Sequence, residues 1–415
     1  MHIGPVVRAM NHNRTRVTLI ILEIAITLAI VTNCVNVILA ERAKMATRSG
    51  FEDTGIVRLH TRPFVPEFQD EAFIRTTVDA DLQAIEGVPG VEAVANTSFQ
   101  LWEGGGSSTE IRPAGSSSAP VRTQIYYGSQ NITQSLGATV SEGRPFAEGE
   151  HGSGSGEESA SVVIISRALA EALFPGQPAA GRSIEFVTGT GEATGDPYAI
   201  VGVMERFFNP FGMPGADPDP FEERGLFYPQ RAGSYAQGLR YLIRVSDPGD
   251  MAAIITEIER RIVEVNPGRV VEFEPVSEKK ARWFATSSLM VTTMTFIIAM
   301  LVIISALGLI GITALSVAER TRQIGTRRAL GATRADILRH FLIENAIITA
   351  AGLALGIVAT YALNVFLVAN LVDAKMPPML ILFGIALLLL NAIVATLPPA
   401  FRAMGISPAV ATKSI

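Results

Sequence analysis

Four long stretches with almost no charged residues constrain this chain more than any other feature. They cover residues 17–40, 283–318, 345–372 and 376–401, and Glu23 is the only charged side chain within them. Each stretch supplies the roughly 20 apolar residues that cross about 30 Å of hydrocarbon. They lack the strict alternation of barrel strands, so we predict four transmembrane helices, at residues 17–40, 288–317, 341–370 and 377–399.

The chain between the first two predicted spans, residues 41–287, is long enough for one large domain or two small ones. Its apolar periodicities predict a mixed α+β fold, with helices near 70–86, 167–174 and 251–266 and strands near 91–99, 161–166, 198–204, 239–245 and 270–276. Residues 277–287 contain no Pro or Gly, and we predict that they extend the second span outward as a helical stalk.

Irregular segments separate these elements. Residues 104–118 and 147–160 are rich in Gly and Ser, and their composition favours solvated linkers. A group of aromatic residues, Phe207, Phe208, Phe211 and Phe221, is compatible with either a contact surface or buried packing.

Charge asymmetry indicates the topology. Residues 41–287 hold 22 Lys and Arg against 34 Asp and Glu, whereas the rest of the chain holds 12 against 5. Arginines flank the first span on its N-terminal side, fill the loop between spans two and three, and follow span four. The positive-inside rule therefore predicts that residues 1–16, 318–340 and 400–415 are cytoplasmic and that the large domain lies outside.

The cytoplasmic loop, residues 318–340, combines six arginines with apolar residues at roughly helical spacing, interrupted by Gly325 and Gly331. A loop that only anchors lipid headgroups would need the arginines alone. Short amphipathic helices with flanking arginines suit docking into a groove of a soluble partner, which is the interpretation we favour.

The stretch ERTRQIGTRRALGAT, residues 319–333, resembles the signature of the MacB/FtsX/LolCDE-type ABC permeases. Residues 136–146, 161–184 and 200–203 are similar to the periplasmic core domain of that family, and residues 405–412 to its cytoplasmic tail. The resemblance implies that the loop seats on an ATPase, although Gln323 stands where the family usually has an acidic residue. The coupling residues that it implies are Glu319, Arg320, Thr321, Arg322, Ile324, Gly325, Arg327, Arg328, Leu330, Gly331 and Ala332.

Sites for chemistry are missing from the sequence. It has no G-x-x-x-x-G-K-[ST] phosphate loop, and the Gly-rich residues 104–109 lack the lysine that such a loop requires. The five histidines have no metal-ligand spacing, and no acid/base pair or nucleophile motif is present. We therefore expect no enzymatic activity, no bound cofactor or metal and no nucleic-acid partner, and we expect a separate chain to bind ATP and Mg²⁺.

A few polar and small residues lie within the predicted spans. Glu23 is about 9 Å into the first span, where Arg14 or Arg16 could pair with it. Asn33 and Asn36 lie deeper and could hydrogen-bond across helices or to a second permease chain. Gly352 and Gly356 form a G-x-x-x-G motif that permits close helix packing.

These features together predict mechanical transmission. A dimer of ATPase subunits would move the loop, and the second span would carry that motion to the outer domain of two permease chains, identical or related. We favour efflux of a peptide, antibiotic or other amphiphile through a periplasmic adaptor and an outer-membrane channel. A lipoprotein-releasing permease and a regulator of a cell-wall hydrolase that transports nothing remain alternatives. The sequence names neither the substrate nor the outer contact surface.

Overall fold

The computed structural model of the protein describes residues 14–150, 161–188, 191–213, 219–230, 236–370 and 376–406. It divides into two compact units. The helical unit comprises the chain up to Met45 and from Ser287 onward, and the α+β unit comprises Ala46–Thr286. Three predicted segments lie partly outside the described residues: the N-terminal segment up to residue 13, the Gly/Ser-rich residues 151–160 and the tail beyond residue 406.

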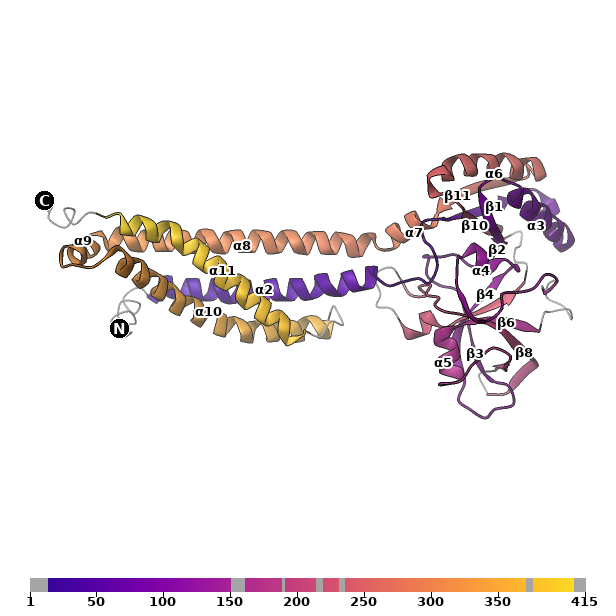
Figure 1. Ribbon diagram of the computed structural model, residues 1–415, viewed down its shortest axis with the longest axis horizontal. Helices are drawn as coiled ribbons and strands as arrows, with labels where there is room; N and C mark the ends of the chain where they lie inside the picture. The colour runs from indigo at the N-terminus through magenta and orange to yellow at the C-terminus, as the bar shows by residue number, and fades with distance from the viewer. Residues whose placement is uncertain are drawn as a thin grey trace. The chain divides into compact units, whose positions relative to one another are not determined.

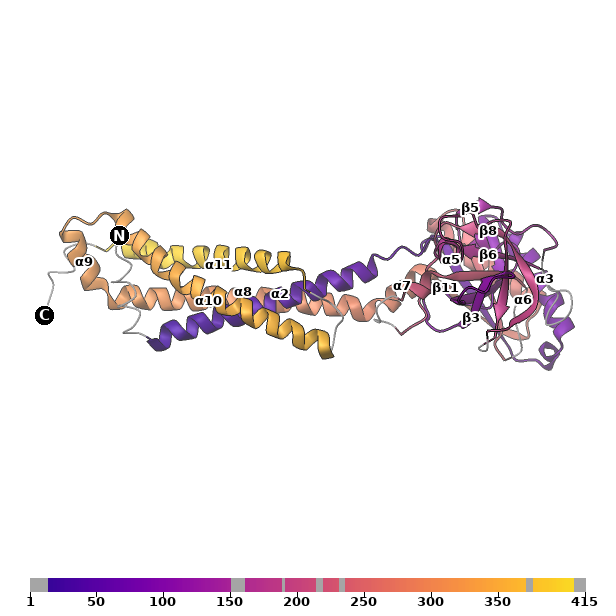
Figure 2. The same cartoon turned by 90° about the horizontal axis from the view of Figure 1, so that it is seen from below.

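The helical unit contains four long helices, α2 (Arg14–Met45), α8 (Ala285–Glu319), α10 (Arg334–Asn370) and α11 (Pro378–Met404), and a short helix, α9 (Thr321–Ala329) (Figure 2). All four long helices are long and apolar enough to cross a membrane. Together with the α+β unit they confirm the predicted fold class. The helices are longer than the predicted spans because polar residues at their ends continue the helical hydrogen bonding.

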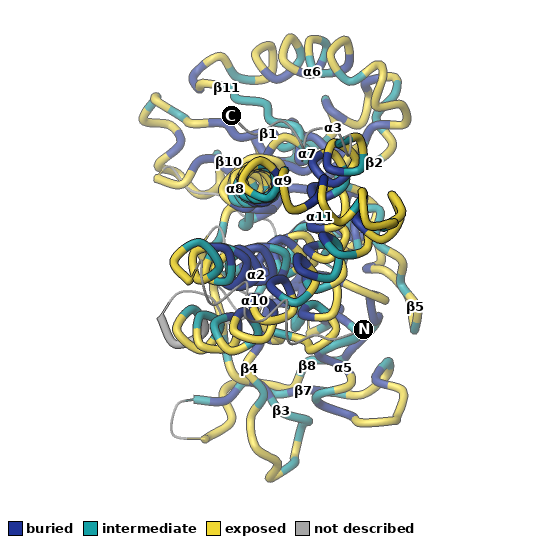
Figure 3. The backbone as a smooth tube through the Cα atoms, turned by 90° about the vertical axis from the view of Figure 1, so that its left-hand side faces the viewer, coloured by how far each residue is buried: buried dark blue, intermediate teal, exposed yellow. Residues whose placement is uncertain are grey.

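Helix α2 supplies the centre of the helical unit, and Figure 3 shows much of it as buried. Its residues Ile20, Ile24 and Leu28 pack with Leu353 of α10 and Leu388 of α11. Leu28 is fully buried, as expected for a helix that contacts neighbours on more than one side.

The α+β unit has two sheets (Figure 1). The smaller sheet contains β1 (Ile56–Pro63), β2 (Val91–Asn96), β10 (Leu239–Val245) and β11 (Arg269–Pro275), in the order β11-β1-β10-β2 with antiparallel pairing. Helices α3 (Glu71–Glu86) and α6 (Met251–Val265) contribute every third or fourth residue to a shared core with this sheet. That spacing is the one that places side chains on a single helix face.

A buried ion pair crosses this core. Arg269 of β11 donates hydrogen bonds at 2.5 Å to both carboxylate oxygens of Asp81 on α3. The Tyr241 hydroxyl of β10 donates to the same carboxylate, also at 2.5 Å. Both charged side chains are fully buried, so each depends on the other for compensation of its lost hydration.

The larger sheet has the order β5-β8-β6-β9-β4-β3-β7, and β7 also pairs with β8. The extra pairing closes the strands from β8 to β7 into a ring. Its strands are β3 (Ser107–Pro113), β4 (Val121–Gly128), β5 (Val140–Gly143), β6 (Val162–Ser166), β7 (Ser183–Val187), β8 (Ala193–Met204) and β9 (Gly225–Pro229). The short elements of the unit are α4 (Ile132–Ser135), α5 (Arg167–Leu173), α7 (Val276–Trp283), and the 3₁₀ turns η1 (Pro66–Gln69), η2 (Pro220–Glu223) and η3 (Pro248–Asp250).

The interpretation of residues 104–118 as a solvated linker is wrong. Residues 107–113 form β3, which pairs with both β4 and β7. Gly104 packs so closely that a Cβ there would lie 2.4 Å from the carbonyl oxygen of Gly212 and 3.0 Å from the ring of Trp283. Gly104 serves a close backbone approach, which composition alone does not distinguish from flexibility.

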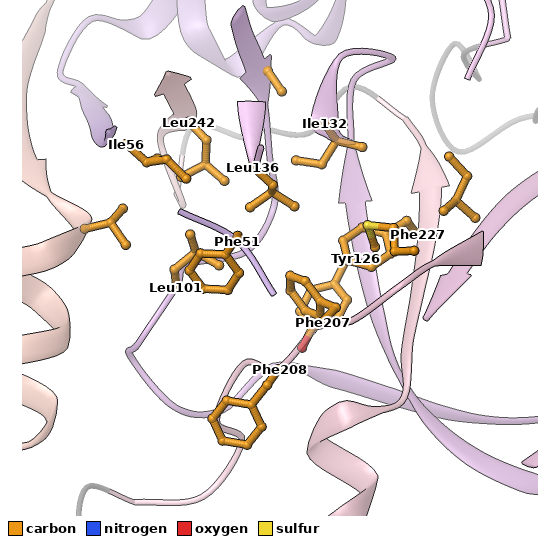
Figure 4. Packing of buried hydrophobic residues seen from close by; sticks show 14 of the residues in the cluster. Phe51, Ile56, Leu101, Tyr126, Ile132, Leu136, Phe207, Phe208, Phe227 and Leu242 are labelled. Atoms are coloured by element: carbon orange, nitrogen blue, oxygen red, sulfur yellow. The ribbon is translucent and has the colours of Figure 1, made fainter. Parts of the chain in front are cut away.

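The aromatic group between β8 and β9 is mostly core. Phe207, Phe208 and Phe221 are buried, and Figure 4 shows Phe207 close to Tyr126 and Phe227. Phe211 is half-buried, and its ring lies 5.1 Å from that of Phe221. Packing therefore accounts for most of this group.

The predicted stalk is helical but is not a simple outward extension of the span. Helix α7 ends at Trp283, and Phe284 separates it from α8. Val276 and Trp283 are buried in the cluster that also contains Phe51 and Trp102, and Lys279 pairs with Glu103 at 2.7 Å. The pattern that predicted an outward stalk is instead that of a helix packed within the α+β unit.

Candidate coupling surface

Helix α9 ends in a glycine cap. The amide of Gly331 donates to the Arg328 carbonyl at 3.2 Å, and the amide of Ala332 to the Arg327 carbonyl at 3.0 Å. This pair of bonds is a Schellman motif, in which the residue after the cap adopts a left-handed conformation. Gly331 has φ +100°, so glycine is required here by backbone geometry.

The next helix, α10, begins at Arg334 after a reciprocal cap. The Thr333 hydroxyl accepts from the Asp336 amide at 3.2 Å, and the Asp336 carboxylate accepts from the Thr333 amide at 3.0 Å. This exchange satisfies two amides at the start of α10. The sequence Leu330–Thr333 is therefore a compact corner between two helices.

One side of this corner packs on the helical unit. Ile324 is buried, at 5 % exposed, among Val317, Ile337 and Phe341 and the end of α11 at Ala400 and Ala403. The predicted coupling residue Gly325 is also buried, and Ala332 is partly buried against the same cluster. These three residues hold α9 in place and face inward.

Polar contacts fix α9 at both of its ends. Arg16 of α2 donates to both carboxylate oxygens of Glu319 at 2.9 Å. Arg320 donates at 2.8 Å to Glu344, a buried carboxylate of α10. Arg328 donates to the carbonyl oxygens of Met404 and Ile406 at the end of α11.

The opposite side of α9 is open. Arg322, Arg327 and Leu330 are exposed, and Leu330 is the extreme case at 83 %. Arg322 and Arg327 make no ion pair with any residue that the structure describes. Of the sequence-predicted residues, these three and the exposed Gly331 form the outward surface, whereas Glu319, Arg320 and Arg328 make ion pairs or hydrogen bonds within the chain. Thr321 also turns inward and donates to the Val317 carbonyl at 2.9 Å.

The polar residues of the membrane helices contact neighbouring helices of the same unit. Of the two arginines that could pair with Glu23, Arg16 instead binds Glu319. Glu23 lies beside α8, where a Cβ on Gly308 would be 2.7 Å from its carboxylate oxygens. Asn33 donates to the Thr360 carbonyl at 3.3 Å and accepts from Asn364 at 3.3 Å, so it links α2 with α10. Asn36 is buried on the same helix.

The G-x-x-x-G motif of α10 faces α2. A Cβ on Gly352 would lie 2.8 Å from Ile24, and a Cβ on Gly356 would lie 2.9 Å from Leu28. Both glycines thus permit a close approach of the two helices, as small residues do in membrane proteins. Within the described part of the chain, no three His, Cys, Asp or Glu side chains gather as a metal site would require.

Comparison with known families gives two matches that cover most of the chain. Residues 18–261 match the MacB-like periplasmic core domain, and residues 295–408 match the FtsX-like permease C-terminal domain.

The relatives include the macrolide export ATP-binding/permease protein MacB of Azoarcus sp. (strain BH72), 26 % identical over 98 % of this chain and 58 % of the relative. The pyoverdine export ATP-binding/permease protein PvdT of Pseudomonas syringae is 27 % identical over 65 % of this chain and 40 % of the relative. The uncharacterized ABC transporter permease YknZ of Bacillus subtilis is 25 % identical over 68 % of this chain and 65 % of its own. The chain spans little more than half the length of the MacB relatives that it matches.

Two solved structures are also similar. The periplasmic region of MacB from Actinobacillus actinomycetemcomitans is 13 % identical, with 58 % of this chain and 97 % of that chain covered and a TM-score of 0.35. The extracellular domain of YknZ is 16 % identical, with coverages of 52 % and 99 % and a TM-score of 0.32.

Proposed function

This chain belongs to the family of MacB-like ABC transporter permeases, and from that premise we propose that it transmits the force of ATP hydrolysis to its α+β unit. The ATPase would lie outside these 415 residues, which contain no phosphate loop and show no catalytic constellation. The chain itself would act as a force transmitter without enzymatic activity, and would bind ATP and Mg²⁺ only through that partner.

The observation that carries the proposal is the two-sided character of α9. Its inner side is fixed to α2, α10 and α11 by apolar packing and by Arg16, Arg320 and Arg328. Its outer side presents Leu330 between exposed arginines. A rigid helix with one apolar projection and flanking cations fits a groove on a soluble protein, and its anchors would pass any displacement to three membrane helices.

The cytoplasmic location of α9 rests on the distribution of arginines. The chain ends and α9 would lie on the inner side of a bacterial inner membrane, and the acidic α+β unit would lie in the periplasm. Two permease chains, identical or related, would face two ATPase subunits.

The names of two relatives support the substrate class that we propose. The relatives MacB and PvdT are named for macrolide and pyoverdine export, which favours an exporter of amphiphilic small molecules or peptides over a lipoprotein-releasing permease or a hydrolase regulator. We propose that a periplasmic adaptor and an outer-membrane channel complete the route.

The test is affinity purification of the tagged chain in mild detergent, followed by mass spectrometry of the retained proteins. We expect an ABC ATPase with the wild type and its loss with the double variant Arg327→Glu/Leu330→Asp. The matched control is Arg62→Glu/Phe64→Asp, which likewise reverses an exposed arginine and replaces an exposed apolar side chain by aspartate, but in the α+β unit. Retention of the ATPase by the α9 variant would reject the docking surface, and absence of any ATPase from the wild type would reject the proposed function.

A further inference from the structure

Trp102 has an unusual backbone conformation. It is the only non-glycine residue in the described part of the chain with a positive φ, at +55°. The left-handed region is disfavoured for a bulky side chain, and such a residue stays there only where its contacts with the surrounding structure compensate for the strain. The turn continues through Gly104 at +74°, Gly105 at +71° and Gly106 at +142°. A residue other than tryptophan would therefore be favoured at position 102 on backbone grounds alone.

The contacts of Trp102 hold it in this conformation. Its side chain is 1 % exposed. The backbone amide donates to the Asn209 side chain at 3.0 Å, and the indole N–H donates to the Asp53 carboxylate at 2.9 Å. The Lys280 ammonium lies over the indole ring at 5.0 Å. The rings of Phe51 and Phe284 lie 6.2 and 5.5 Å from it.

These partners come from two particular segments of chain. Residues 46–53 follow α2, and residues 276–284 precede α8, so they are the two covalent connections between the α+β unit and the membrane helices. We call them the root segments. Asp53 belongs to the first and Lys280 to the second, and their side chains pair directly at 2.6 Å.

Trp102 belongs to neither root segment, yet it contacts both. Asp53 uses one carboxylate oxygen for the indole N–H and the other for Lys280. The lysine reaches the ring face at the same time, which adds a cation–π attraction. The three residues therefore form one connected unit, and the side chains of Asp53 and Lys280 are mostly shielded from solvent.

We propose that Asp53, Trp102 and Lys280 form a clamp that makes the two root segments move as one body during the transport cycle. This inference rests on the proposed function, because it concerns how displacement of the membrane helices enters the α+β unit. Without the clamp, displacements of α2 and α8 would reach the α+β unit independently through the two root segments. Part of the displacement would then move the root segments apart and would not move the unit.

An ordinary core tryptophan gives a different expectation. Burial alone explains the ring contacts of Trp102. It does not explain the left-handed backbone, nor the contacts of the indole with Asp53 on one root segment and Lys280 on the other. Loss of an ordinary core contact would lower stability equally in every nucleotide state. Loss of a clamp would change the geometry of the roots specifically when force is applied.

The experiment measures the distance between the roots under load. The full chain, with Cys34→Ser to remove the native thiol, receives spin labels at Arg48→Cys and Thr286→Cys, both exposed positions on the root flanks. It is reconstituted with its ATPase in nanodiscs, and the intrachain distance distribution is recorded by pulsed electron resonance without nucleotide and with ATP–vanadate. The variants are Trp102→Phe, which keeps a ring but loses the indole N–H, and Lys280→Met.

Two controls separate the clamp from general effects. Arg282→Met removes the same charge from an exposed position of α7 outside the clamp, and Lys280→Arg retains the cation over the ring. We expect one narrow distance in both nucleotide states for the wild type and for both controls. In Trp102→Phe and Lys280→Met we expect that distance without nucleotide and a second population with ATP–vanadate.

Each other outcome has a distinct meaning. A wild type whose root distance changes with nucleotide, or clamp variants that keep one distance in both states, would overturn the clamp and leave the proposed function intact. Failure of the wild-type chain to bind any ATPase would overturn the proposed function itself. Thermal unfolding of each variant shows whether the α+β unit is folded. A second distance population in the clamp variants without nucleotide, as well as with ATP–vanadate, would assign Trp102 a purely structural role.

Discussion

Truncation of Leu330 to alanine tests whether the outer side of α9 is a docking surface. Leucine exceeds alanine by three carbons, and each buried methylene contributes about 0.8 kcal/mol. Because 83 % of the leucine is exposed in the free chain, its burial against a partner would contribute about 2 kcal/mol. We therefore expect Leu330→Ala to weaken binding of the ATPase about 30-fold and to leave the stability of the permease unchanged.

The matched substitution is Ile324→Ala, on the inner side of the same helix. Ile324 is 5 % exposed and packs on Val317 and Phe341, so its truncation should cost about 2–5 kcal/mol of local stability. The assay titrates purified ATPase against nanodisc-embedded permease by interferometry, with thermal unfolding recorded in parallel. Binding of Leu330→Ala within about twofold of wild type would refute the docking argument, since burial of this leucine against the partner should contribute about 2 kcal/mol.

Two further predictions concern the α+β unit. Arg269→Met leaves the buried Asp81 carboxylate without its partner and should lower the free energy of unfolding by about 3–5 kcal/mol in urea titrations, whereas Arg269→Met/Asp81→Leu should recover most of that loss. Burial, with smaller effects of nearby arginines, lowers the pKa of His60, so the unfolded chain binds its proton more readily than the folded chain. The contribution of neutral His60 to the free energy of unfolding should therefore be fully present above about pH 6.5 and should decline as the pH falls below that value. The measurement is the melting temperature of the wild type and of a His60→Gln variant from about pH 7.5 to pH 5.5. An equal decline in the two proteins would contradict this prediction.

The membrane helices could be predicted because their constraint is local. A helix in hydrocarbon must be apolar along its whole length, so each span is visible in a window of about 20 residues. The strands of the larger sheet carry no such signal. β3 has one fully buried side chain, Ile111, in seven residues, and its place depends on pairing with β4 and with the distant β7. Whether such a segment forms a strand depends on pairing partners that lie far apart in the sequence.

Helix α7 shows a second limit. An amphiphilic helix that enters a membrane span has the same sequence pattern whether its apolar side meets solvent, a second chain or its own domain. Trp283 and Lys279 are buried because Gly104 and Glu103 come from the turn after Trp102. The glycine content of that turn favours a flexible linker, so the sequence offers α7 no packing partner within its own domain. Trp102 and Lys280 carry no local signal either, because their contacts come from segments far apart in the sequence.

The arginines of the coupling segment show what only the structure could supply. The loop contains six arginines, and the family resemblance assigns four of them the same role in coupling. The structure divides them by partner: Arg320 neutralises the buried Glu344, and Arg328 satisfies the carbonyls that end α11, while Arg322 and Arg327 remain exposed. Reversal of an anchoring arginine would bury an unpaired charge and distort α9, so lost ATPase binding in such a variant would say nothing about contact with the partner. Only exposed positions such as Arg327 and Leu330 can separate docking from folding, which is why the tests of coupling are confined to them.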